Sequence, residues 1–209
     1  QIKCSIKWKE KIIKELTKIE KNGQKTCPMK KRKMKINKIV QRKISMDYVF
    51  FSGKIDLDTN YFIQKIDEQI RGDDNLNGKT NVIGGMTNWN FFSKDEKFWT
   101  PFFPIQDYID QKDLFSGTIY NIKEVWGLCE PKGAYTKLHK HFPSVFGGVI
   151  YLNSSDQKLF FPDIGEEIKP EPGTFVIFNG FLNHFTNRNT SNTPKYALSF
   201  NAYAAMIGE

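Results

Sequence analysis

The sequence has few of the residues from which common catalytic and structural motifs are built. Its 209 residues include only three histidines and three cysteines, and Cys4, Cys27 and Cys129 form no Cys-x-x-Cys pair. An odd number of cysteines without such a pair indicates neither a disulfide framework nor a thiolate zinc site. The sequence therefore predicts a protein of a reducing compartment, and we expect it in the cytoplasm.

Long apolar runs are also missing. No stretch approaches the roughly 18 apolar residues of a membrane-spanning helix, and the N-terminal segment lacks the apolar run of a secretory signal. We therefore expect a soluble protein with no membrane span that is not exported. A hydrophobic content of 39% with 14% aromatic residues favours a folded chain with a bulky core over a disordered one.

Positive charge is concentrated at one end of the chain. Residues 1–45 contain 16 lysines and arginines against three glutamates, a formal net charge of +13, which leaves residues 46–209 with 15 basic and 20 acidic residues, or −5. A domain that binds a polyanion carries its positive charge on the surface that makes the contacts. Nucleic-acid binding is therefore not expected of residues 46–209. Only residues 1–45, the basic arm, have the charge for a phosphate backbone or an anionic membrane surface.

Composition also divides the chain into two parts. In the basic arm, apolar Trp8, Ile12 and Leu16 recur at helical spacing, which predicts a short amphipathic helix in a segment that is partly helical or disordered. Residues 46–209 are long enough for one domain with its own core and too short for two. We therefore expect a solvated arm followed by a single domain.

The domain begins with a strand and a helix and continues as short strands. Residues 47–55 have a strand pattern, and residues 58–72 have the pattern of a helix capped at Asp58 or Thr59. Residues 73–104 are predicted as loops, with a short helix at 105–111. Runs bounded by Gly, Pro, Asn and Asp follow at 118–128, 134–141, 145–153, 158–163, 174–180, 181–187 and 196–203. Their spacing predicts an all-β sandwich or barrel.

The histidines suggest a metal site. His139 and His141 lie one residue apart in a predicted strand, so strand alternation places both on one face together with Tyr135. Two imidazoles on one face are a beginning for a metal site, which needs a third ligand from a neighbouring strand. His184, the remaining histidine, follows a turn after an apolar strand, the position of a barrel mouth. An isolated His-x-His pair is common by chance, but the three positions together predict a metal centre.

The order of these segments resembles a known family, the 2-oxoglutarate and Fe(II)-dependent oxygenases, in particular a phage and marine-bacterial branch. The resemblance spans residues 118–203 and rests on "HKHFPS", "GGVIYL", "PGTFVIF", His184 and "KYALSFNAY". It implies a mainly β fold, the double-stranded β-helix or jelly roll, with N-terminal helices buttressing one sheet. For a phage-encoded protein, the cytoplasm would be that of the host cell.

Carried onto this sequence, the resemblance assigns three metal ligands. His139 and His184 match the two histidine ligands of the family. His141 falls where most of the superfamily has Asp or Glu, so a neutral imidazole replaces an anion and leaves the site more cationic. We take His141 as the third ligand, the alternative being a water molecule at that position with His141 behind it.

The resemblance also implies a site for the cosubstrate. Lys195 stands where the family has the Arg or Lys that pairs with the distal carboxylate of 2-oxoglutarate. A buried cation without an anion is costly, which is a physical reason to expect an anionic ligand there. Arg188 is the rival cation, in a segment with a loop pattern. Strand alternation puts Ser199 and Asn201 on the face of Lys195, and Tyr135 is a candidate hydrogen-bond donor to the cosubstrate.

Taken together, these features imply an Fe(II)- and 2-oxoglutarate-dependent dioxygenase that consumes O₂ and releases succinate and CO₂, with ascorbate as a candidate accessory. The expected reaction is hydroxylation of a peptidyl side chain, such as a prolyl residue, or of a small molecule. One alternative is a three-histidine zinc hydrolase or lyase, in which Lys195 has no role. The other is a non-catalytic, metal-binding jelly-roll module.

Overall fold

The computed structural model describes residues 48–71, 81–91, 94–111 and 118–206. The basic arm and its expected helix lie outside these residues, so the predicted boundary between arm and domain stays a prediction. None of the helices in the described residues has the length and apolar character that crossing a bilayer requires.

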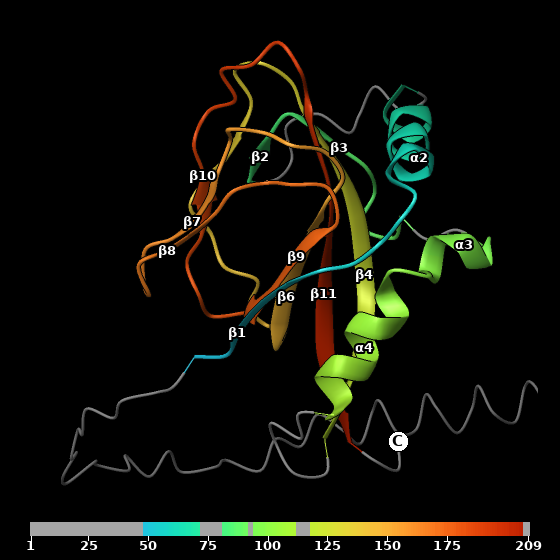
Figure 1. The fold of residues 1–209 in the computed structure, drawn as a ribbon. Helices are drawn as coiled ribbons and strands as arrows, with labels where there is room; N and C mark the ends of the chain where they lie inside the picture. Colours follow the sequence, from blue (N-terminus) through green and yellow to red (C-terminus); the bar gives the residue numbers. More distant parts are fainter. Residues whose placement is uncertain (1–47, 72–80, 92–93, 112–117, 207–209) are drawn as a thin grey trace, which may run out of the picture. The chain divides into compact units, whose positions relative to one another are not determined.

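The largest sheet has six strands, each antiparallel to its neighbours (Figure 1). In spatial order they are β1 (Phe50–Lys54), β9 (Thr174–Asn179), β6 (Phe146–Tyr151), β11 (Lys195–Met206), β4 (Thr118–Glu130) and β3 (Gly85–Met86). A second sheet consists of β10 (Phe185–Thr186), β7 (Leu159–Phe161) and β8 (Glu166–Ile168), and β2 (Val82–Ile83) pairs with β5 (Tyr135–Thr136).

Three helices lie on one side of the six-stranded sheet (Figure 1). They are α2 (Thr59–Arg71), α3 (Glu96–Trp99) and α4 (Phe102–Gln111). Phe62, Phe98 and Phe102 from the helices join Phe146 and Phe200 from the sheet in one buried cluster. The predicted buttressing of one sheet by N-terminal helices is therefore confirmed.

The opposite face of the six-stranded sheet carries a second buried cluster. Val149 from β6 and Phe178 from β9 pack there with Phe161 from β7 in the smaller sheet. Every residue of β6 is buried, because one set of its alternate side chains faces the helices and the other set faces the smaller sheet. The two facing sheets form the jelly roll that the resemblance implied.

The predicted elements agree with the structure in type more than in extent. The helix predicted at 58–72 is α2, and the predicted strands all contain observed ones. The strand expected at 134–141 is shorter, because β5 ends at Thr136. β2, β3, β8 and the short α3 were not predicted, and β2, β3 and α3 all lie inside the predicted loop. α4 also begins in that loop, at Phe102, since its buried aromatic ring packs on the sheet.

Candidate metal centre

The structure brings the three histidines together from separate segments. The backbone N–H of His139 donates to the carbonyl of His184 at 3.1 Å, and the N–H of His184 donates to the carbonyl of His139 at 3.0 Å. The N–H of His141 donates to the carbonyl of Gly180 at 2.9 Å. The ring centroids of His139 and His184 are 4.2 Å apart, and those of His141 and His184 are 4.8 Å apart. Backbone pairing therefore holds together the three histidines that the sequence singled out.

Hydrogen bonds set the tautomer of two of the rings. Nδ1 of His139 lies 2.8 Å from the carbonyl oxygen of Lys137, and Nδ1 of His184 lies 3.1 Å from that of Leu182. A carbonyl oxygen only accepts, so each Nδ1 carries the proton and each Nε2 presents a lone pair. This is the form in which histidine binds a metal, with its second nitrogen held by a carbonyl.

The third ring, that of His141, is oriented by a side chain and not by a backbone carbonyl. Its Nδ1 lies 2.5 Å from Oδ1 of Asn201, so this ring also presents Nε2. Nε2 of His141 and Nε2 of His184 are 3.1 Å apart, and one nitrogen of each of the three rings lies within 4.8 Å of the others. Two lone pairs facing each other at this distance are unfavourable without a cation between them. The donor set therefore fits a metal ion that prefers imidazole ligands, such as iron or zinc.

Burial keeps the cluster uncharged. Desolvation lowers the pKa of His141 to about 4, with a further contribution from His139. Desolvation likewise holds the pKa of His184 well below its usual value, and it lowers that of His139. The three rings are therefore neutral near neutral pH, and no proton has to leave before a metal binds.

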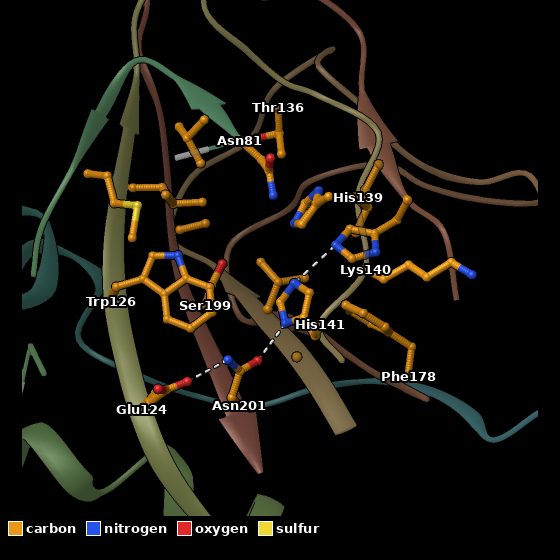
Figure 2. A pocket seen from close by; sticks show the side chains of 18 of the residues that line it. Asn81, Glu124, Trp126, Thr136, His139, Lys140, His141, Phe178, Ser199 and Asn201 are labelled. Atoms are coloured by element: carbon orange, nitrogen blue, oxygen red, sulfur yellow. Dashed lines mark hydrogen bonds between the residues drawn. The ribbon is translucent and has the colours of Figure 1, made fainter. Parts of the chain in front are cut away.

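The histidines open into a cavity of about 670 Å³ on the face of the sheet away from the helices. Apolar side chains from three strands form much of its wall, among them Trp126, Leu128, Val149 and Phe178. At the rim, Trp89 is 47% exposed and Phe142 is 65% exposed. Figure 2 shows the labelled histidines and Trp126 around this space. Its volume suits a small molecule or one side chain of a larger one.

Lys195 lines the cavity as predicted, but it is not an unpaired cation. Its ammonium lies 2.5 Å from the carboxylate of Glu130, and the two side chains are 3% and 0% exposed. The argument that a bare buried cation demands an anionic ligand is therefore wrong here, because Glu130 supplies the anion. Glu130 is directly opposite Lys195 in the β4–β11 pairing, a partnership that depends on register and that the sequence did not reveal.

The surroundings of Lys195 contain further polar groups. Glu130 also accepts hydrogen bonds from Thr136 Oγ1 at 3.1 Å and from Gln157 Nε2 at 3.3 Å. Tyr151 lines the cavity, and desolvation, followed by the nearby charge of Glu130, raises the pKa of its phenol. Tyr151 is therefore a protonated donor. It was not predicted, although its alternation with Val149 in "GGVIYL" was a usable signal.

The remaining predicted residues divide into two groups. Ser199 and Asn201 line the cavity with Lys195, as alternation along β11 predicted. Tyr135 is not among the lining residues: the guanidinium of Arg188 lies 4.3 Å from its ring centroid. The prediction that Tyr135 shares the histidine face is wrong, because β5 ends before His139 is reached. Arg188 is exposed and donates to the carbonyl of Gly133 at 3.0 Å, so it lies outside the cavity wall as well.

Comparison with solved structures identifies the fold. A viral collagen prolyl hydroxylase from Paramecium Bursaria Chlorella virus-1, solved in complex with 2-oxoglutarate, superposes with a TM-score of 0.58 at 16% identity, over 75% of this chain and 96% of that one. A Pseudomonas putida prolyl-4-hydroxylase gives 0.53 at 17% identity, over 76% and 93%. A Trichoplax adhaerens prolyl hydroxylase, bound to a hypoxia-inducible-factor peptide, gives 0.59 at 15% identity, over 74% and 83%. The sequence itself matches no family model and no curated protein.

Proposed function

We propose that this chain, which has the jelly-roll fold of the 2-oxoglutarate and Fe(II)-dependent oxygenases, is itself such an oxygenase. In this proposal it hydroxylates a peptidyl or small-molecule substrate and converts 2-oxoglutarate and O₂ to succinate and CO₂. The fold is established by the solved structures, whereas the activity rests on the cavity of this chain.

The observation that carries the proposal is the convergence of three imidazole rings, with one nitrogen of each within 4.8 Å of the others, in a largely apolar cavity. His139, His141 and His184 would hold the metal, each oriented by an acceptor at its Nδ1. A bound Fe(II) would supply the activation of O₂ that no protein side chain provides. The chain's own contribution is to fix the ligands and to keep bulk water from the reacting groups.

The cavity wall near Lys195 has the donors for the distal carboxylate of 2-oxoglutarate. An ammonium has three N–H groups, and the bond from Lys195 to Glu130 uses one of them. The hydroxyl of Tyr151 adds a second donor on the same wall. The proposed cosubstrate would therefore share Lys195 with Glu130 and would not meet an unpaired cation.

Apolar groups at the cavity rim favour a substrate that places a side chain into the cavity. The rings of Trp89 and Trp126 are in contact, with centroids 4.6 Å apart, and Phe142 contacts Phe181 with centroids 5.2 Å apart. Exposed aromatic groups at a cavity mouth are typical of binding surfaces. The Trichoplax adhaerens protein is a prolyl hydroxylase solved with a peptide, which supports a peptidyl substrate as the first class to test.

Iron binding and cosubstrate turnover test the proposal. Anaerobic Fe(II) titration should give one site per chain, lost in His139→Ala and His184→Ala. Asn183→Ala is a matched control, because Asn183 precedes His184 but bonds to exposed Asp163. With Fe(II) and ascorbate, the wild type should form succinate from 2-oxoglutarate in the presence of peptide or metabolite pools.

Two results would redirect the assignment. A site that binds Zn²⁺ and hydrolyses test esters, with no succinate formed under any condition, would favour the zinc hydrolase or lyase. Equal metal stoichiometry in the wild type and in His184→Ala would remove the metal centre itself from the proposal.

A further inference from the structure

His141 is the end of a chain of hydrogen bonds that begins at a carboxylate. Glu124 Oε2 accepts from Nδ2 of Asn201 at 2.6 Å, and Oδ1 of Asn201 faces Nδ1 of His141 at 2.5 Å. Figure 2 shows these bonds as dashed lines between the labelled side chains. The other two histidines have backbone carbonyls at the corresponding nitrogen, so only His141 is held by a side chain.

The order of donors and acceptors leaves one consistent arrangement. A carboxylate only accepts, so the amide nitrogen of Asn201 must face Glu124 and its oxygen must face His141. That oxygen in turn requires a proton on Nδ1 of His141, which leaves a lone pair on Nε2. Glu124 therefore selects the tautomer of His141 from two hydrogen bonds away.

The pairing of β4 with β11 positions the residues of this chain of hydrogen bonds. Glu124 on β4 is directly opposite Asn201 on β11, and the register shifts between Asn201 and Ala202. The hydroxyl of Tyr203, beyond the shift, donates to the same Oε2 of Glu124 at 2.9 Å. Two donors from one strand thus hold the Glu124 carboxylate in position.

The negative charge of Glu124 gives this chain of hydrogen bonds a second role. Within the described residues, the candidate metal group consists of three imidazoles and no carboxylate. A divalent ion held by neutral ligands keeps its full charge in a partly buried site, which is unfavourable without a nearby anion. Glu124 also lines the cavity, and its negative charge is connected to a ligand by two short hydrogen bonds.

We propose that Asn201 and Glu124 are positioning residues for the metal site: Asn201 fixes the orientation and tautomer of His141, and Glu124 supplies the anionic charge that the three-histidine set lacks. The inference rests on the proposed function for the identity of the site. Its first test needs no metal, so the two can fail separately.

Nitrogen-15 NMR of histidine-labelled, metal-free protein reads the tautomers directly near neutral pH. In the wild type, Nδ1 should carry the proton in all three rings. In Asn201→Ala, His141 should lose this preference, while His139 and His184 remain unchanged as internal controls. A protonated Nε2 on His141 in the wild type, or an unchanged His141 in Asn201→Ala, would overturn the positioning role of Asn201 whether or not the protein binds metal.

Variants at Glu124 separate charge from orientation. In Glu124→Gln the new amide oxygen still accepts from Asn201, so the His141 tautomer should persist while affinity for Co(II) and Fe(II) falls. Asn201→Ala should weaken metal binding by about 10- to 100-fold, the usual effect of removing a partner of a metal ligand. Tyr203→Phe leaves intact the two hydrogen bonds that connect Glu124 through Asn201 to His141, here called the relay, and should have the smallest effect on metal affinity. If Glu124→Gln binds Co(II) as tightly as the wild type, the charge role is wrong.

A double variant provides the rescue. In Glu124→Gln with Asn201→Asp, the glutamine amide donates to a carboxylate that lies directly against Nδ1 of His141. The donor order is preserved and the charge is one residue closer, so Co(II) affinity should return to the wild-type level or exceed it. An affinity as low as that of Asn201→Ala would overturn the relay. A wild type that binds no metal would instead overturn the proposed function and leave the NMR result to decide the relay.

Discussion

Replacing Lys195 by methionine removes the cation from a buried ion pair and leaves the Glu130 carboxylate behind. The atoms are 2.5 Å apart and the side chains are 3% and 0% exposed, so solvent screens the pair weakly. Breaking a buried pair by removing one partner costs about 3–5 kcal/mol of unfolding free energy. Thr136 and Gln157 still donate to Glu130 in the variant, which places the expected loss for Lys195→Met near the lower end.

Removing the anionic partner instead, in Glu130→Gln, should cost less unfolding free energy. Lys195 lines the cavity, whereas Glu130 does not, so in Glu130→Gln the remaining ammonium has access to cavity water. Removing both charges together leaves no uncompensated ion, and such replacements are often neutral or stabilising. The double variant should therefore be more stable than Lys195→Met alone. Urea unfolding of the wild type, both single variants and the double variant completes a thermodynamic cycle.

The same four proteins test the cosubstrate site. Lys195→Met should raise the 2-oxoglutarate concentration needed for half-maximal succinate formation by at least about 30-fold, the equivalent of roughly 2 kcal/mol. Glu130→Gln should lower it, because the cosubstrate no longer shares the ammonium with a protein carboxylate. Arg188→Ala, outside the cavity wall, is the control. Destabilisation below about 1 kcal/mol in Lys195→Met, or an equal rise in both single variants, would refute the reasoning.

Three further predictions follow from the site and the sequence. Gly147→Ala would place a Cβ 2.7 Å from Nδ1 of His141 and should weaken metal binding. Gly148→Ala would instead place a Cβ against the ring of Phe200 and should cost about 1–3 kcal/mol of stability. Reversed effects in metal titration and urea unfolding would contradict this. Because burial lowers the pKa of His141 from 6.5 to about 4, the unfolded chain binds more protons in this window, so metal-free protein should lose stability as pH falls from about 6.5 to about 4. This loss should be smaller in His141→Asn, and equal pH profiles from urea unfolding would refute it. Deleting residues 1–45 should abolish any salt-sensitive binding to DNA or anionic vesicles while leaving unfolding of the domain unchanged, and retained binding would locate the basic surface elsewhere.

Local patterns in the sequence predicted the elements and the histidine cluster well. The helix α2 was found because apolar residues repeat at helical spacing behind a cap, and both properties are local. His139 and His141 were expected together because they alternate in a predicted strand, and His184 was added because it follows a turn after an apolar strand. The failure at Tyr135 has a local cause too, since alternation predicts a shared face only while the strand continues, and β5 ends at Thr136.

The acidic partners could not be predicted in the same way. Glu124 and Glu130 lie 77 and 65 residues before their respective partners, Asn201 and Lys195, and nothing in the intervening sequence connects them. Their contacts depend on which residues β4 and β11 place opposite each other. Cross-strand register is a property of the whole sheet, so a charge that neutralises Lys195 is invisible until the strands are paired.

One strand pair, β4 with β11, therefore positions both the hydrogen-bond relay behind His141 and the wall of the proposed cosubstrate site. Glu124 and Glu130 are an even number of positions apart on β4, so they share a face, and each is directly opposite its partner on β11, Asn201 and Lys195. A slip of β11 by one residue against β4 would turn Asn201 and Lys195 to the helix side while Glu124 and Glu130 stayed, and would remove the relay to His141 and the ion pair together. The same register that buries the apolar wall thus places one carboxylate behind the proposed ligand His141 and the other beside the proposed anchor Lys195. The two carboxylates offset charges of different origin, since Glu124 would offset the proposed metal ion and Glu130 offsets a lysine. Substitutions at Glu124 should consequently change metal affinity without changing the 2-oxoglutarate requirement of metal-saturated protein, and substitutions at Glu130 should do the opposite.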